Sequence, residues 1–275
     1  MEKAVKRFVQ GNNAIDGAGV KLVRVLGLRT VKDYDPFLML DSFDSHNPSD
    51  YIAGFPMHPH RGIETITYLV EGEIDHQDSL GNKGKIESGG MQWMTAGSGI
   101  LHQEMPQPKN RILGLQLWLN LPSKDKMTNP KYFDIDQSMV KIINEEFATI
   151  RVVSGNYRGI EGVKPNHIQA TIFDVTVKKG QEIFLPTISN QTCFIFTLLG
   201  KVLIDGQTYQ EKSAILFGEG DGIRLSASSE NDLQFMFVQA EPLHESIAWG
   251  GPIVMNTEEE LEQAFKDLRR GTFIK

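Results

Sequence analysis

Short apolar runs, separated by turn residues, recur from residue 20 to residue 240. The runs are VKLVRVLG, PFLMLDSF, ETITYLVEGEI, RILGLQLWL, ATIFDVTV, CFIFTLLGKVLI and DLQFMFVQA. Many short strands at near-regular spacing, divided by Gly, Pro and Asp, are typical of a β-sandwich or a β-barrel. In ETITYLVEGEI the alternation of side-chain types indicates a strand with two unlike faces. The sequence therefore predicts an all-β fold.

Helical periodicity over several turns is found near the C-terminus, in NTEEELEQAFKDLRRG. Thr257 and Glu260 predict a capping box at its start. Acidic residues fill the first turn and basic residues the last, and Gly271 ends the periodic pattern. We therefore expect a short C-terminal α-helix after the strands.

Two stretches of the chain resemble each other. FPMHPHRGIETITYLVEGEI and FLPTISNQTCFIFTLLGKVLI each run from a Phe and a Pro through a strand to a Gly that precedes a second strand. When Gly72 is matched to Gly200, Pro186 and Ile188 stand where the first stretch has its two histidines. A chance likeness between β segments is the alternative. If the repeat is real, the chain holds two similar barrels, and only the first carries a polar cluster.

The junction between the two barrels is expected in LPSKDKMTNPKYFD, residues 121–134, where Pro, Ser, Lys and Asn interrupt the strands. This predicts an N-terminal domain over residues 1–130 with the polar cluster. A second domain, residues 131–275, would lack the cluster and end in the helix.

Composition excludes several classes of function. The 275 residues, 40% hydrophobic and 23% charged, suffice for a packed core. No apolar run reaches the roughly 18 residues of a membrane span, and MEKAVKRFVQGNN lacks the features of a signal peptide. A single cysteine, Cys193, rules out an intrachain disulfide and fits a reducing compartment. The net charge of −7 disfavours nucleic-acid binding. We expect a cytoplasmic protein that neither spans a membrane nor binds nucleic acid directly.

The stretch GFPMHPHRGIET holds two of the seven histidines. His58 and His60 are two residues apart, so on a strand they project from one face, and Pro59 limits the motion of both. GSGILHQEMP supplies His102 and Glu104 at the same spacing. Two such pairs on neighbouring strands would bring three imidazoles and a carboxylate together. Unrelated surface histidines are the alternative, which two pairs among seven histidines make the weaker interpretation.

The identity of the carboxylate ligand is open at this point. Glu64 shares strand parity with His60 and follows it at the spacing HxHxxxE, whereas Glu104 is coupled to His102. Geometry alone does not choose between them. The other histidines have no second histidine or carboxylate at this spacing in a similar segment and are expected to be solvent-facing or structural: His46, His76, His167 and His244. Of these, His76 is the least settled because it lies in the same predicted barrel.

Three imidazoles and a carboxylate without thiolates suit a divalent ion such as iron, manganese, nickel, copper or zinc. A structural zinc site would use cysteine and close all four positions. On octahedral Fe(II), four protein ligands leave positions for a substrate or dioxygen, which predicts redox or Lewis-acid chemistry on a small molecule. Nearby apolar residues would either line a pocket for it or belong to the core: Phe55, Met57, Trp93, Met94 and Met105.

The pattern HxHxxxE, with a glycine-rich turn and a later histidine, resembles the cupin motif, and the finer resemblance is to the pirin family. The similar segments are DPFLMLDSF (35–43), HPHRGIET (58–65), QWMTAGSGILHQEMP (92–106) and GGPIVMNTEEELEQAF (250–265). The histidine after TAGSG comes later than in the general cupin motif, which is itself pirin-like. The resemblance implies a bicupin, that is, two stacked antiparallel β-barrels of the double-stranded β-helix or jelly-roll type, with one iron in the N-terminal barrel only.

Carried over residue by residue, the resemblance implies a definite set of metal ligands. These are His58, His60, His102 and Glu104. The resemblance thus selects Glu104 over Glu64. Glu64 would then either orient a ligand imidazole through a hydrogen bond, or pair with Arg61 or face solvent.

Because pirins resemble quercetin 2,3-dioxygenases, the resemblance implies an Fe(II)-dependent oxygenase that acts on a flavonol such as quercetin with dioxygen. Glu104 would take the proton of the 3-hydroxyl group, and ring opening would release carbon monoxide and a depside. A second implication is an iron- or redox-dependent regulatory protein that binds a transcriptional or metabolic protein partner. Another aromatic enediol or ketone as substrate is a third, since cupins host many functions.

Overall fold

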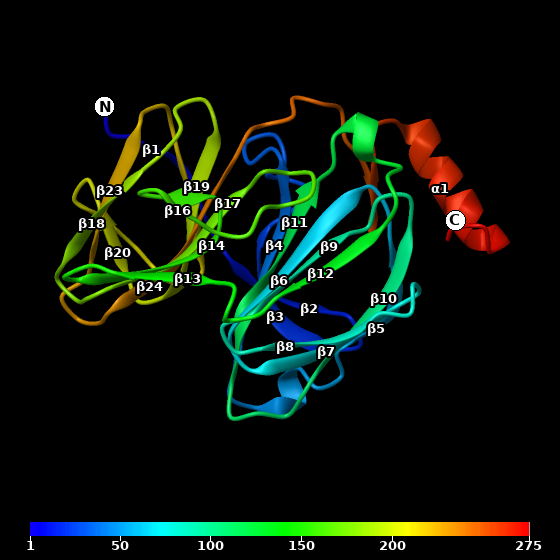
Figure 1. Cartoon of the computed structure of the whole chain (residues 1–275), viewed down its shortest axis with the longest axis horizontal. Helices are drawn as coiled ribbons and strands as arrows, with labels where there is room; N and C mark the ends of the chain where they lie inside the picture. The colour runs from blue at the N-terminus through cyan, green and yellow to red at the C-terminus, as the bar shows by residue number, and fades with distance from the viewer. Residues whose placement is uncertain (275) are drawn as a thin grey trace. The chain divides into compact units, whose positions relative to one another are not determined.

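The computed structural model describes residues 1–274, which are built of antiparallel strands and one C-terminal α-helix. The chain divides into two compact units, each made from two segments (Figure 1). The N-terminal barrel comprises Asn13–Gln137 and the chain from Leu243 onward, and the C-terminal barrel comprises Met1–Asn12 and Ser138–Pro242. The predicted all-β fold with a terminal helix is confirmed. No helix within residues 1–274 is long and apolar enough to cross a membrane.

The N-terminal barrel consists of a seven-stranded and a four-stranded sheet. The first has the order β12-β9-β6-β11-β4-β3-β2, with strands Lys131–Ile135, Met91–Thr95, Ile63–Glu71, Ile112–Asn120, Phe37–Ser45, Val20–Leu26 and Asn12–Asp16. The second has the order β5-β10-β7-β8, with strands Phe55–His60, Ile100–Pro106, Glu73–Asp78 and Lys83–Glu87. Apolar side chains of both sheets share one core cluster, so the space between the sheets is the interior of the barrel.

The C-terminal barrel repeats this topology. Its larger sheet has the order β1-β22-β19-β24-β17-β14-β13, with strands Val5–Gln10, Ser213–Phe217, Thr192–Leu199, Leu233–Ala240, Thr171–Val177, Ala148–Ser154 and Lys141–Asn144. Its smaller sheet has the order β18-β23-β20-β21, with strands Glu182–Pro186, Gly222–Ala227, Val202–Ile204 and Gln207–Tyr209. The matching orders support the internal repeat that the sequence suggests.

The two units differ from the simple division at residues 130 and 131. β1 pairs antiparallel with β22, at the position in its sheet that β12 takes beside β9 in the other barrel. The first residues of the chain therefore complete the C-terminal barrel, and the chain from Leu243 onward returns to the N-terminal barrel. In each larger sheet the edge strand is paired by a segment that lies outside the simple division: β1 covers β22, and β12 covers β9. Pairing of this kind protects an otherwise open sheet edge.

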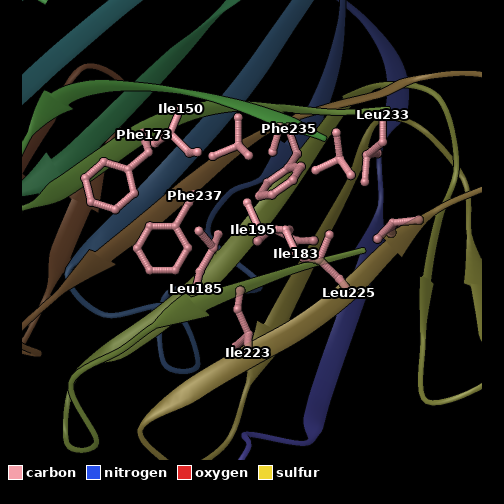
Figure 2. Close-up of a cluster of buried hydrophobic side chains, with 14 of the residues drawn as sticks. Ile150, Phe173, Ile183, Leu185, Ile195, Ile223, Leu225, Leu233, Phe235 and Phe237 are labelled. Carbon is pink, nitrogen blue, oxygen red and sulfur yellow. The ribbon is translucent and has the colours of Figure 1, made fainter. Parts of the chain in front are cut away.

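The interior of the C-terminal barrel is apolar. Figure 2 shows its packed side chains, among them Phe173 and Phe237, whose rings stack with centroids 5.2 Å apart. Ile183 and Leu185 of β18, with Ile223 and Leu225 of β23, are buried in this core. These strands hold the positions in their sheet that β5 and β10 hold in the N-terminal barrel. The second barrel thus places aliphatic side chains where the first places histidines.

The last part of the chain forms a hairpin and the helix α1 (Glu258–Arg270), drawn in red in Figure 1. The predicted capping box is present, since the Thr257 side chain accepts from the amide of Glu260 and the Glu260 side chain accepts from that of Thr257. Gly271 ends the helix in the left-handed conformation. The remaining short elements are η1 (Pro48–Asp50), η2 (Ser123–Asp125), β15 (Asn156–Tyr157), β16 (Ile160–Glu161), β25 (Ala248–Gly250) and β26 (Ile253–Met255).

Candidate metal centre

Three histidines meet on neighbouring strands of the smaller sheet in the N-terminal barrel. β5 supplies His58 and His60, and β10 supplies His102, which pairs in register with His58. A β-bulge between His102 and Glu104 shifts the register of this pairing. Each imidazole offers a nitrogen within 4.8 Å of the other two. The two pairs that the sequence nominates therefore contribute three imidazoles to one point, as predicted.

Backbone carbonyls fix the orientation of two of these rings. His58 Nδ1 lies 2.9 Å from the carbonyl oxygen of Pro56, and His60 Nδ1 lies 3.0 Å from that of Pro252. Because a carbonyl oxygen can only accept, each Nδ1 carries the proton and each Nε2 has a free lone pair. The two Nε2 atoms are 3.0 Å apart. When both rings are neutral, these two lone pairs face each other, and a cation beside both would stabilise the arrangement.

His102 lies deeper than either of them. Its side chain is fully buried, and neither ring nitrogen has a hydrogen-bond partner among the described residues. Burial, together with the neighbouring imidazoles, lowers the pKa of His102 well below its ordinary value, so the ring is neutral. Buried polar atoms without a partner are costly. A coordinated cation would satisfy one nitrogen of His102 and also the two lone pairs on β5.

These observations fit a divalent metal ion bound by the three imidazoles. Burial lowers the pKa of His60 and of His102, which favours the neutral imidazole that a metal requires as a ligand. The carbonyls behind His58 and His60 fix the tautomer and the ring direction, as is typical around metal-bound histidines. The three imidazoles could therefore hold an ion, and the ligand set alone does not distinguish iron from nickel, copper or zinc.

Glu104 is buried in the same interior but does not belong to the group of three mutually close ligand atoms. Its Oε1 accepts a hydrogen bond of 2.7 Å from the hydroxyl of Thr67. That hydroxyl also lies 2.6 Å from the side-chain oxygen assigned to Gln116. One hydroxyl hydrogen cannot serve both oxygens, so the Gln116 amide is better turned to donate to Thr67. Thr67 and Gln116 thereby hold one carboxylate oxygen of Glu104 and leave the other for a ligand.

Glu64 lies elsewhere. The pairing of β6 with β9 is regular from residue 64 to residue 68, so Glu64 and Thr67 point to opposite faces of β6. Thr67 faces Glu104, and Glu64 is fully buried on the other face, where it accepts from Thr95. The parity argued from HxHxxxE fails because the chain turns at Gly62, with φ +78°, between β5 and β6. Burial excludes the alternative that Glu64 faces solvent, whereas a hydrogen bond from Glu64 to a ligand imidazole and its pairing with Arg61 stay predictions.

His76 lies beside His102, whereas sequence reasoning left it as solvent-facing or structural. It stands opposite Glu104 in the pairing of β7 with β10, and its ring centroid is 5.3 Å from that of His102. Neither of its nitrogens has a hydrogen-bond partner among the described residues, and the carboxylate of Asp78 is 3.8 Å away. Burial lowers the pKa of His76. The alternation of His76 and Asp78 in EIDHQD was the available signal, but only the register reveals its neighbour.

A cavity of about 700 Å³ opens onto this centre. His58, His60 and Glu104 are among the polar residues that line it. Of the apolar residues that the sequence nominated as lining, only Phe55 lies on its wall, whereas Trp93 and Met94 are core. The wall is instead made by aromatic and sulfur-containing side chains from distant parts of the chain: Met39, Phe43, Trp118 and Trp249.

Three charged side chains that contact one another also line the cavity. Arg24 donates to both carboxylate oxygens of Asp41, at 2.8 and 2.6 Å, and to Asp16 at 2.6 Å. Burial raises the pKa of the Asp41 carboxyl, and the adjoining guanidinium opposes that shift. All three side chains line the cavity, so a ligand there meets a polar wall as well as the aromatic one.

The buried imidazoles predict a pH dependence of stability in the metal-free protein. Burial and the nearby His58 lower the pKa of His60 from 6.5 to about 3. Below pH 6.5 His60 binds a proton in the unfolded chain but not in the native protein. The free energy of unfolding therefore decreases as the pH falls from 6.5 towards 3. We expect His60 alone to cost about 3 kcal/mol at pH 4.5.

The measurement is urea unfolding of the metal-free protein at pH 7.5 and pH 4.5. His60→Gln should reduce the difference between the two unfolding free energies by roughly the same amount. His46 is exposed in the same barrel, so His46→Gln serves as the control and should leave the difference unchanged. An equal pH dependence in wild type and His60→Gln would contradict the expectation.

Comparison with known proteins places this centre in context. Residues 19–119 match the family described as Pirin, and residues 172–274 match the family described as Pirin C-terminal cupin domain. The chain is 40% identical to a pirin-like protein of Caulobacter vibrioides, over 98% of this chain and 99% of that protein. It is 37% identical to human pirin, over 97% and 92%. A crystal structure of quercetin 2,3-dioxygenase from Acinetobacter baumannii superposes with a TM-score of 0.90, at 33% identity and 99% coverage of both chains.

Proposed function

Because the chain belongs to the pirin family, we propose that it is an Fe(II)-dependent dioxygenase that opens the central ring of a flavonol such as quercetin and releases carbon monoxide. The observation that carries the proposal is the cavity lining, where His58, His60 and Glu104 stand on the same wall system as aromatic side chains such as Trp118 and Trp249. The solved quercetin 2,3-dioxygenase of Acinetobacter baumannii supports the substrate class.

His58, His60 and His102 would hold the iron, with Glu104 as the fourth ligand. When bound, the iron supplies Lewis acidity and redox capacity to the oxygen atoms of a substrate and to dioxygen. Burial keeps His60 and His102 neutral, and the carbonyls of Pro56 and Pro252 hold His58 and His60 in one tautomer. The protein thus prepares the ligand set before the ion arrives.

Glu104 is the residue that would accept the proton of the flavonol 3-hydroxyl group. Its carboxylate lines the cavity, and Thr67 occupies one of its oxygens. The other oxygen has two lone pairs, so it could bind the ion with one and accept a proton with the other from a hydroxyl that approaches the centre. The hydrogen bond from Thr67 also limits rotation of the carboxyl group, which keeps that oxygen directed into the cavity.

The size and lining of the cavity suit a planar aromatic substrate. Its volume of about 700 Å³ lies within the roughly 300–1,000 Å³ of small-molecule sites. Phe43, Phe55, Trp118 and Trp249 offer ring faces and edges to the substrate. Arg24 and Asp41 on the cavity wall can form hydrogen bonds with hydroxyl groups on the outer rings of the substrate.

The test is anaerobic loading with Fe(II), followed by addition of quercetin and air. We expect loss of the flavonol absorption band and release of one carbon monoxide for each quercetin consumed. The metal-free protein is the control and should consume none. If iron-replete protein leaves quercetin intact, the oxygenase proposal fails, and capture of a protein partner in the iron-dependent state becomes the next experiment.

A further inference from the structure

The C-terminal hairpin, residues 248–255, lies against the strand that carries two of the metal-binding histidines. His60 Nδ1 donates to the carbonyl of Pro252, which is 192 positions further along the chain. Beside it the amide of Val254 donates to the carbonyl of Arg61 at 3.1 Å, and Arg61 forms a parallel bridge with Ile253. The orientation of one imidazole therefore depends on a remote part of the chain.

Arg61 fastens this hairpin and the following helix to the barrel. The side chain is only 2% exposed. Its Nε donates to the carbonyl of Ser98 at 2.7 Å, Nη1 to the carboxylate of Asp267 at 2.8 Å, and Nη2 to the carbonyl of Phe273 at 2.9 Å. The guanidinium also lies 4.2 Å from the centroid of the Phe273 ring. A lysine ammonium cannot reach three acceptors held in these directions.

Gly62, which follows Arg61, also packs tightly against the hairpin. Gly62 adopts φ +78°, and a Cβ atom there would lie 1.9 Å from the carbonyl oxygen of Val254. The buried Lys126 bridges these two segments, because its Nζ donates to the carbonyl of Gly62 at 2.7 Å and to that of Val254 at 2.9 Å. The backbone after His60 and the hairpin therefore cannot move independently.

The helix side of this assembly is apolar. α1 packs Leu261 and Ala264 into a cluster with the hairpin and Phe273, and Leu101 of β10 contacts that cluster. Leu101 precedes the ligand His102. The C-terminal segment thus contacts both strands that supply imidazoles.

We infer that Arg61 is a positioning residue for the metal centre. Its guanidinium holds α1 and Phe273, which pack on the C-terminal hairpin, and its carbonyl accepts from Val254 of that hairpin. The Pro252 carbonyl of the same hairpin directs the ring of His60. The inference rests on the metal site of the proposed function. Since coupling between two sites is reciprocal, binding of the ion in turn tightens the packing of the hairpin and α1.

The first test measures binding of Co(II), whose visible absorption reports the coordination geometry. Arg61→Lys and Asp267→Asn should bind Co(II) about 10- to 100-fold more weakly than wild type, as changes behind metal-bound histidines do. At saturating Co(II) their absorption bands should differ in position or intensity, an effect that lower stability alone does not produce. The control is Lys266→Met, which removes an exposed ion pair with Glu262 on the same helix.

The second test follows amide hydrogen exchange with and without Co(II). In wild type, Co(II) should slow exchange in residues 248–274, and in Arg61→Lys the slowing should be smaller. If Arg61→Lys does not fold, Asp267→Asn, which keeps the shape of the side chain, carries both measurements.

Each outcome decides the inference. Wild-type affinity and absorption in both variants would overturn it, and so would exchange in residues 248–274 that ignores the ion. If wild type does not bind Co(II), the inference and the proposed function both fail. If coupling is found but iron-loaded wild type does not consume quercetin, the proposed function alone fails.

Discussion

His102→Ala is expected to abolish metal binding, the largest single effect that the structure predicts. His102 is the most deeply placed imidazole of the three, and its nitrogens have no protein partner among the described residues that could compensate. Changes to groups behind a ligand cost about 10- to 100-fold in affinity, so loss of the ligand itself should exceed about 100-fold. Metal content after anaerobic loading with Fe(II) and desalting should fall from about one equivalent to near zero.

The expected loss must be separated from unfolding. His102→Gln keeps more of the side-chain volume and should also lose the metal, whereas exposed His46→Ala should keep it. Circular dichroism of each metal-free variant checks that the barrels form. Retention of one tightly bound ion by folded His102→Ala would show that the imidazole cluster is not the metal site.

Much of the centre could be predicted because its signals are local. Side chains two residues apart on a strand lie on one face. The shared face of His58 and His60, and that of His102 and Glu104, could therefore be predicted from their spacing alone. The capping box at Thr257 is equally local and is present in the structure. Local rules of this kind need only the chain segment itself.

What failed depends on turns and on pairing between distant segments. Glu64 lies on the opposite face of β6 from the one that its spacing predicts, because the turn at Gly62 interrupts the alternation of side chains between β5 and β6. The spacing HxHxxxE does not reveal that turn. His76 becomes a neighbour of His102 only through the register of β7 on β10. Trp249 reaches the cavity because the chain returns to the first barrel after Pro242. No periodicity within a single segment contains such information.

Glu104→Gln is expected to lower flavonol turnover by about 10²- to 10⁴-fold, the range associated with loss of a positioned general base. The amide keeps the shape of the carboxyl group and can still accept from Thr67, but it cannot take the proton of the substrate hydroxyl. Rates are measured at saturating Fe(II) and quercetin, so that any weaker binding of the metal is compensated. Metal content is measured on the same samples.

Thr67→Val provides the matched comparison for this prediction. It removes the hydrogen bond that holds one oxygen of Glu104 and leaves the carboxylate itself in place. If Glu104 acts as the base and Thr67 only directs it, Thr67→Val should lower turnover by much less than Glu104→Gln, and Thr67→Ser should restore it. If Glu104→Gln instead turns over quercetin at the wild-type rate with a full complement of iron, another group takes the proton. The role of Glu104 would then be limited to binding the metal, and the cavity would have to supply a different base.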